Sequence, residues 1–378
     1  MKKHFLLLWI ICFSTIAFAQ TELRNLTVEN ASNPIGIGVK APRFSWQLVS
    51  NKRNVKQTAY EIQVKEGNNT VWSTGKVASE ASIFNKYSGS PLVSNSKYTW
   101  QVRVWDNQGK ASKWAISSFG TALLHSNEWK ATWIASGLKS DTVNGIVPMF
   151  RKSFLANKKI ASAKVYVTSR GLYEVKINGK RMGDSYLSPG WTSYDKHLQY
   201  QTYDVSNLLS EGKNAIGVLL GSGWYRTRLG WENKQNIYGK ETAILFQMEI
   251  KYADGTTQTV VSDTSWKANN SYIISSEIYN GEIQDARLEQ KNYSVASFDD
   301  SKWSTVVAKD FPTNYITAAI NEPIRKHENL KPIAVLTSPK GETILDFGQN
   351  IAGWVQVSIQ GKSGDQIKLS HVEMLDKK

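Results

Sequence analysis

A two-residue alternation of apolar and polar side chains is the feature of this 378-residue chain that most restricts its fold. After residue 20 the alternating runs are short and are separated by Gly, Asn, Asp and Pro, and no stretch combines sustained helical periodicity with matching caps. Because successive side chains of a strand point to opposite faces, such runs predict strands with one buried face. Many short strands joined by tight turns are typical of sandwiches and jelly rolls. The sequence therefore predicts an all-β protein.

The first 19 residues have the pattern of a signal peptide. Lys2 and Lys3 precede an apolar run at 5–13, and the small-x-small pattern at 17–19 predicts cleavage before Gln20. We therefore expect export, either to the periplasm or out of the cell. The apolar run is too short for a spanning helix, and no later segment approaches the roughly 18 apolar residues that one needs, so we expect no membrane span.

Composition restricts the cofactors and partners. The single cysteine, Cys12, lies within the signal, so the mature chain has no disulfide and no thiolate metal site. The net charge is +14, and it falls by two to +12 when Lys2 and Lys3 are removed with the signal. The remaining basic residues are scattered along the chain, and this distribution indicates a solvated surface rather than a nucleic-acid partner. We expect no cofactor. A structural calcium ion bound in a loop is an alternative, but the acidic residues are too dispersed along the sequence for its ligands to be named.

Clusters of turn residues divide the mature chain into three β units. The first, at 20–122, has about seven alternating runs and no cysteine pair, which predicts a fibronectin type III-like sandwich with Trp46 and Trp100 in its core. A linker is expected at 123–145 and a jelly-roll sandwich at 146–318.

The third unit, from 319 to 378, ends in alternating runs. Val355, Val357, Ile359, Ile367 and Leu369 alternate with polar neighbours and predict further strands. The pattern stops at Lys378 before a compact unit would close, so the chain looks cut off inside a truncated domain.

Candidate ligand-contacting residues gather at 221–231. This segment contains Trp224, Tyr225, Arg226 and Trp231, and Trp191 lies in an earlier loop. Aromatic faces form platforms for sugar rings, and a guanidinium supplies forked donors for hydroxyl groups. These residues are therefore candidate carbohydrate contacts, and packing of loops between sheets is the alternative.

A second candidate is the acidic cluster Glu282, Asp285 and Glu289. Hydrolysis of a glycosidic bond needs two carboxyl groups on opposite sides of the scissile linkage. Arg287 is close enough in the sequence to neutralise one of these carboxylates, so a structural ion pair is the favoured interpretation, with carbohydrate contact by Glu282, Asp285 and Arg287 as the alternative.

Short motifs also occur in a fixed order along nearly the whole mature chain. They are APRFSW at 41–46, VRVWD at 102–106, GLYE at 171–174 with ING at 177–179, LSPGWT at 187–192, YDV at 203–205, GWY at 223–225, YNGE at 279–282 with DAR at 285–287, and DFGQN at 346–350. Together they resemble the bacterial α-L-rhamnosidases of glycoside hydrolase family 78.

The resemblance implies a fibronectin-like module, then a jelly roll, then the start of a concanavalin-like sandwich. In that family an (α/α)6 barrel follows and carries the catalytic acids, which release L-rhamnose with inversion of configuration. The chain ends before the barrel, so we expect no catalytic residue in it and no activity of the chain alone. The implied partners are rhamnose-containing glycans and the catalytic barrel. A standalone carbohydrate-binding protein and a structural scaffold are the alternatives.

Overall fold

The structure is a computed structural model that describes residues 21–230, 232 and 234–374. The expected signal peptide, with Cys12 and the cleavage site before Gln20, lies outside the described residues. The regular structure of the described part is almost entirely strand, which confirms the all-β prediction. No helix in this part of the chain is long and apolar enough to cross a membrane. The chain divides into two compact units, after residue 324.

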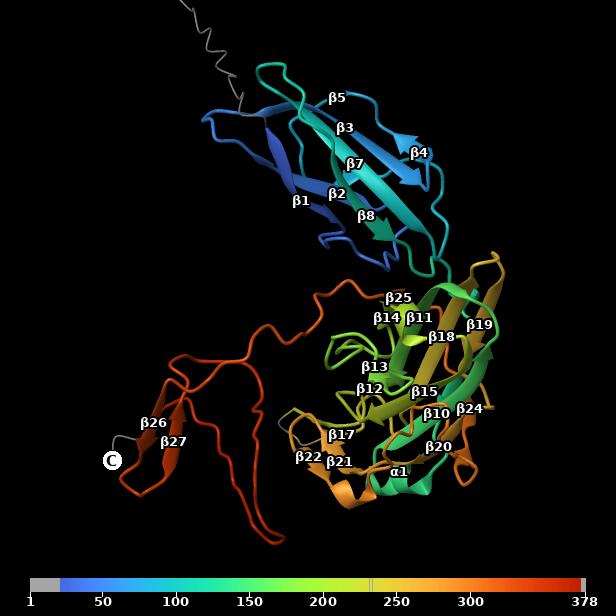
Figure 1. The fold of residues 1–378 in the computed structure, drawn as a ribbon, viewed down its shortest axis with the longest axis vertical. Coiled ribbons are helices and arrows are strands. Elements are labelled where there is room, and N and C mark those ends of the chain that lie inside the picture. The colour runs from blue at the N-terminus through green and yellow to red at the C-terminus, as the bar shows by residue number, and fades with distance from the viewer. Residues whose placement is uncertain (1–20, 231, 233, 375–378) are drawn as a thin grey trace, which may run out of the picture. The chain divides into compact units, whose positions relative to one another are not determined.

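The N-terminal sandwich consists of two sheets (Figure 1, blue to blue-green). The first sheet has the order β1 (Glu22–Val28), β2 (Arg43–Val49), β6 (Asn85–Lys86). The second sheet has the order β4 (Asn69–Ser73), β3 (Gln57–Glu66), β7 (Lys97–Asp106), β8 (Ala115–Gly120), and β5 (Val77–Ala78) pairs with β3. Trp46 and Trp100 are buried in the core between the sheets, as predicted. The Trp100 ring lies 4.7 Å from that of Phe44, and Trp46 Nε1 donates a hydrogen bond to Gln57.

The second sandwich also has two principal sheets. The six-stranded sheet has the order β13 (Lys180–Arg181), β12 (Leu172–Ile177), β15 (Gly212–Gly221), β10 (Pro148–Ala156), β20 (Lys267–Asn270), β23 (Ser304–Thr305). The seven-stranded sheet has the order β24 (Val307–Lys309), β9 (Trp133–Ala135), β18 (Ala243–Tyr252), β11 (Ile160–Arg170), β14 (Leu198–Asp204), β25 (Ile316–Ala318), with β19 (Thr257–Val261) paired to β18. Neighbouring strands are antiparallel except for β14 and β25.

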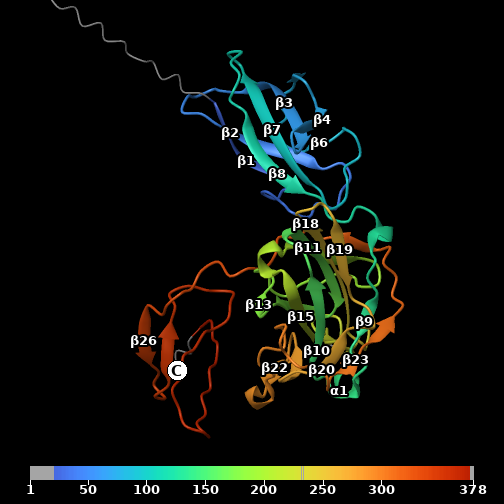
Figure 2. The same cartoon turned by 45° about the vertical axis from the view of Figure 1, so that its right-hand side comes forward.

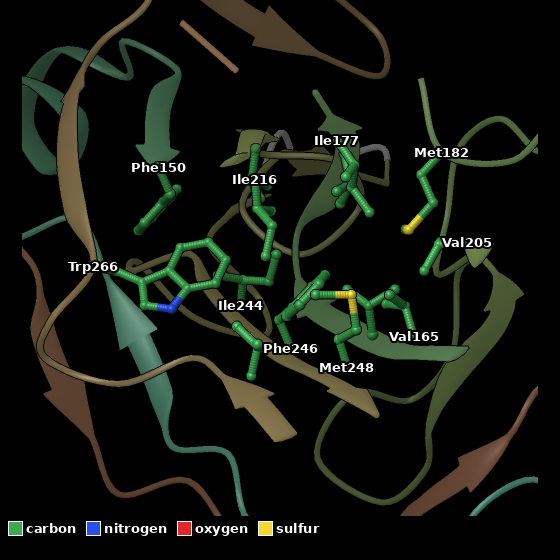
Figure 3. Packing of buried hydrophobic residues seen from close by; sticks show 14 of the residues in the cluster. Phe150, Val165, Ile177, Met182, Val205, Ile216, Ile244, Phe246, Met248 and Trp266 are labelled. Atoms are coloured by element: carbon green, nitrogen blue, oxygen red, sulfur yellow. The ribbon is translucent and has the colours of Figure 1, made fainter. Parts of the chain in front are cut away.

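Apolar side chains from both sheets meet in one core. Figure 3 shows Phe150 and Ile216 of the six-stranded sheet with Ile244 and Phe246 of the seven-stranded sheet, and Trp266 closes one side. The outer face of the seven-stranded sheet is covered too, because alternate residues of β18 belong to a second core. Burial on both faces explains why β18 is almost continuously apolar rather than alternating.

Short elements complete this domain. They are the hairpins β16 (Arg228–Leu229) with β17 (Lys234–Gln235) and β21 (Ile273–Glu277) with β22 (Gly281–Gln284), the helix α1 (Lys139–Asn144), and the 3₁₀ turns η1 (Ser126–Glu128), η2 (Ser206–Leu208) and η3 (Ala286–Leu288). In both views the hairpin β21–β22 and α1 lie at the same end of the sandwich (Figures 1 and 2).

The segment 123–145 differs from the expected linker. Its strand β9 lies inside the seven-stranded sheet, where it pairs with β18 on one side and β24 on the other. Trp133 and Ile134 are buried. The aromatic and apolar residues in the segment supply a strand of the second domain instead of a connection.

The second compact unit, 325–378, contains one hairpin in its described part, β26 (Ala334–Thr337) with β27 (Thr343–Asp346). The strands expected from the later alternating runs are not formed. Val355, Val357, Ile359, Ile367 and Leu369 are exposed and lie outside any strand. A strand needs a hydrogen-bonding neighbour and a surface on which to bury its apolar face, and the described residues of this unit provide neither for these runs.

Candidate aromatic site and relationship to known proteins

Among the candidate aromatic residues that the structure describes, Trp191 is the most exposed, and it is paired with Trp224. Their ring centroids lie 5.9 Å apart and the rings are inclined by only 4°, so they stack. Trp191 is 50% exposed, whereas Trp224 is half-buried against the outer core of the seven-stranded sheet. Trp191 Nε1 donates a hydrogen bond of 3.2 Å to the hydroxyl of Tyr238. The result is an aromatic platform with a polar group at one edge, which we call the Trp191–Trp224 platform.

The loop that carries Trp191 is fixed on both sides of that residue. Tyr194 is buried and donates a hydrogen bond to the carbonyl of Gly190. The side chain of Gln201 in β14 donates a hydrogen bond to the carbonyl of Pro189. The backbone N–H of Tyr173 in β12 donates one to the carbonyl of Ser188. Because these bonds tie the loop to two sheets, the indole of Trp191 is held in place despite its exposure.

Tyr225 belongs to the buried cluster on which Trp224 packs and does not form part of the exposed surface. Its side chain is buried, its ring meets that of Tyr194 at 5.3 Å, and its hydroxyl accepts a hydrogen bond from Arg170. Gly239 passes so close that an added Cβ would come within 2.0 Å of the Tyr225 hydroxyl oxygen. Tyr225 therefore has a packing role.

Arg226 is also directed into the protein. It is 9% exposed, and its Nη1 lies 2.6 Å from Oδ1 of Asp141, which is 1% exposed. Its Nε donates to the hydroxyl of Ser222, and Asp141 accepts a further hydrogen bond from Ser136. Buried charges require such partners, so this ion pair joins α1 to the loop after β15. Arg226 therefore positions the loop.

Three of the remaining candidates lie on the hairpin β21–β22 or just after it. Glu282 is exposed on β22 and hydrogen-bonds Gln284. Asp285 caps η3 by accepting the backbone N–H of Arg287, and Arg287 Nε donates to the same carboxylate at 2.8 Å. These hydrogen bonds from Arg287 lower the pKa of Asp285 to about 2. A carboxyl group held ionised in this way is unsuited to act as a general acid near neutral pH. Trp231 lies outside the described residues.

Two residues that shape this site had no sequence signal. Asp141 lies in the segment predicted to be a linker, and Tyr238 lies in a loop without periodicity. Both act through contacts across the fold, with Arg226 and Trp191 respectively, which spacing along the chain cannot indicate. Among the described residues no group of three or more His, Cys, Asp or Glu could hold a metal ion.

Three family models match the chain in succession. Residues 23–125 match the Rha78A-like, N-terminal immunoglobulin domain, residues 158–328 match the alpha-L-rhamnosidase N-terminal domain, and residues 336–378 match the bacterial alpha-L-rhamnosidase concanavalin-like domain.

Curated relatives agree with these matches. An alpha-L-rhamnosidase of Formosa agariphila is 35% identical over 98% of this chain and 42% of its own length. An alpha-L-rhamnosidase of an Alteromonas species is 34% identical over 92% of this chain and 40% of its own length. The chain thus spans about two fifths of the length of these relatives.

Solved structures show the same relationship. The alpha-L-rhamnosidase of Aspergillus terreus is 36% identical, with a TM-score of 0.81 over 88% of this chain and 39% of that one. The enzyme from Dictyoglumus thermophilum is 37% identical, with a TM-score of 0.76 over 87% of this chain and 38% of that one. The order of the three domain matches and the similarity along nearly the whole chain place it in the bacterial α-L-rhamnosidase family, glycoside hydrolase family 78, as a match to that family's N-terminal domains.

Proposed function

We propose that this chain is the N-terminal, non-catalytic part of an exported α-L-rhamnosidase that removes terminal α-L-rhamnosyl residues from glycans with inversion. The observation that carries the proposal is the 35% identity to an alpha-L-rhamnosidase along 98% of this chain. Relatives of this kind are more than twice as long as the matched part, so the two carboxyl groups that inversion requires would belong to a further domain. The ion pairing of Asp285 with Arg287 supports a structural role for the acidic cluster in this chain.

Turnover of an aryl α-L-rhamnoside tests this proposal. We expect no turnover by the purified 378-residue chain and clear turnover by the gene product from the native host, with the β-anomer of rhamnose as the first product by NMR. Immunoblotting of that host should give a band at about twice the calculated 42.4 kDa or more. Rhamnoside turnover by the pure chain would contradict its non-catalytic role, and an α-anomer as first product would contradict inversion.

A second candidate function is carbohydrate binding by the chain itself, and the half-exposed Trp191–Trp224 platform favours it. Substituting Trp191 with Ala removes the outer ring of the stack but leaves Trp224 packed on the core. We expect this variant to lose binding to rhamnogalacturonan, measured by calorimetry, by about 1–3 kcal/mol, the range for an aromatic contact of this size. The exposed Tyr279→Ala variant, on the β21–β22 turn, is the control. Equal heats from both variants would exclude the platform as the binding surface.

A further inference from the structure

A small cavity lies on the outer face of the six-stranded sheet, and it shares no lining residue with the Trp191–Trp224 platform. Its volume is about 270 Å³, close to the ~300 Å³ at the lower end of the range for small-molecule pockets. Its floor is made by Met149 of β10 and Leu219 of β15, and Lys176 of β12 lines one side. Tyr272 and the segment 289–294 form the other walls.

Tyr293 is the fixed aromatic wall of this cavity. Its side chain is packed against β15 at Gly217, where an added Cβ would come within 2.5 Å of the ring, so only glycine leaves room for it. Trp303 stacks with the same ring, with centroids 6.5 Å apart and an angle of 21°. Tyr293 is only 6% exposed, and both contacts restrict its orientation.

The hydroxyl of Tyr293 is buried and has no hydrogen-bond partner among the described residues. Buried polar groups are nearly always hydrogen-bonded, so an unpartnered one in the wall of a cavity indicates a position that a bound molecule would satisfy. Gln290 differs in this respect, since its side-chain oxygen already accepts a hydrogen bond from Trp303 Nε1 at 3.1 Å.

The surrounding groups restrict the chemistry of that molecule. The Lys176 ammonium, 5.9 Å from the centre of the Tyr293 ring, can only donate hydrogen bonds, whereas the carboxylate of Glu289 can only accept them. An anion would meet the negative charge of Glu289 and of Glu174, which lies close enough to act electrostatically on Tyr293. Lys176 already pairs with Glu174 at 3.9 Å, which further disfavours an anion as a replacement partner. An apolar molecule would leave the Tyr293 hydroxyl without a partner. An uncharged polyhydroxylated ring matches both the polar groups and the aromatic walls.

We propose that this cavity binds a neutral monosaccharide, free or at the end of a glycan, and that the Tyr293 hydroxyl is its central hydrogen-bonding group. The site is distinct from the Trp191–Trp224 platform, and it does not depend on whether the longer protein hydrolyses rhamnosides. It would add a sugar contact to a domain that carries no catalytic residue.

Calorimetric titration of the 378-residue chain with L-rhamnose, D-galactose and D-glucose tests the proposal. We expect saturable binding of at least one of these sugars. Tyr293→Phe keeps the ring and removes only the hydroxyl, so it should weaken that binding about tenfold, the effect of one buried hydrogen bond. Its melting temperature should be unchanged or higher, because the lost hydroxyl has no hydrogen-bond partner among the described residues. Tyr279→Phe, which removes an exposed hydroxyl on the β21–β22 turn, is the matched control and should bind like the wild type.

Three results would overturn the proposal. One is the absence of saturable binding by the wild type at about 10 mM of each sugar, tenfold above a millimolar Kd. Another is equal affinity of the Tyr293→Phe variant and the wild type. The third is loss of all binding in Trp191→Ala, which would assign the sugar to the Trp191–Trp224 platform. None of these results affects the rhamnoside turnover assay, so failure of the cavity and failure of the proposed function can be told apart.

Discussion

The ion pair between Arg226 and Asp141 provides the sharpest test of how this fold is held together. Asp141→Asn keeps the shape of the side chain and removes its charge. The side chains of Arg226 and Asp141 are 7% and 1% exposed, so the variant leaves a guanidinium buried without its counter-charge. Removing one partner of a buried pair costs about 3–5 kcal/mol. In a domain of about 150–250 residues, each kcal/mol shifts the melting temperature by about 2–4 °C. The expected fall is therefore roughly 6–20 °C for the transition of the second domain.

Differential scanning calorimetry of the whole chain measures this shift, and the other sandwich provides an internal reference. Asp254→Asn removes the carboxylate of an exposed pair with Lys158 in the same domain, and this control should change the melting temperature little. The double variant Asp141→Leu with Arg226→Met replaces both charges by apolar groups and should be more stable than Asp141→Asn alone. If Asp141→Asn melts within about 2 °C of the control variant, the argument from buried charge is wrong.

Two further predictions concern the second compact unit and the ion pair between Asp285 and Arg287. Limited proteolysis should cut within 325–374 before it cuts β11 or β18, because this segment has exposed apolar side chains and one described hairpin. Mass spectrometry of the fragments identifies the cuts. Equal resistance of the segment 325–374 and of the two strands would contradict the prediction. NMR titration of the Asp285 carboxyl should give a midpoint near 2 instead of the usual value of about 3.9, because Arg287 stabilises the ionised form. The contribution of this pair to folding stability is complete above about pH 4 and is lost as the pH falls through about 2. A midpoint near 3.9 would show that the pair does not form in solution.

The sequence predicted the strand content well because the alternation reports burial directly. In β12, Tyr173, Val175 and Ile177 face the core while Glu174 and Lys176 face outward, as the two-residue period requires. The same rule failed for the runs at Val355 and Ile367, where the apolar residues are exposed. Periodicity shows which face of a strand would be buried, but it does not supply the neighbouring strand.

The candidate site was predictable only in its residue types. The aromatic side chains of Trp191 and Trp224 predict sugar contacts, but their stacking joins two separate loops and has no signal in either loop. The role of Arg226 depends on Asp141, from the segment expected to be a linker. The same holds for Tyr293, whose environment is set by Gly217 of β15 and by Trp303. Each of these roles depends on which strands are neighbours, and that is a property of the whole sheet.

The pairing of β9 with β24 has a consequence for synthesis. Ala135 lies opposite Val307, so one of the first strands of the second domain to leave the ribosome is hydrogen-bonded to one of the last. At roughly 5–20 residues per second, β9 would wait on the order of ten seconds for that neighbour. During this interval its outer edge has unpaired backbone groups, and the burial of Trp133 is incomplete because β24 and the chain that follows it are still missing. The nascent domain therefore stays open to incorrect pairing or chaperone capture at this edge until residue 309 has emerged.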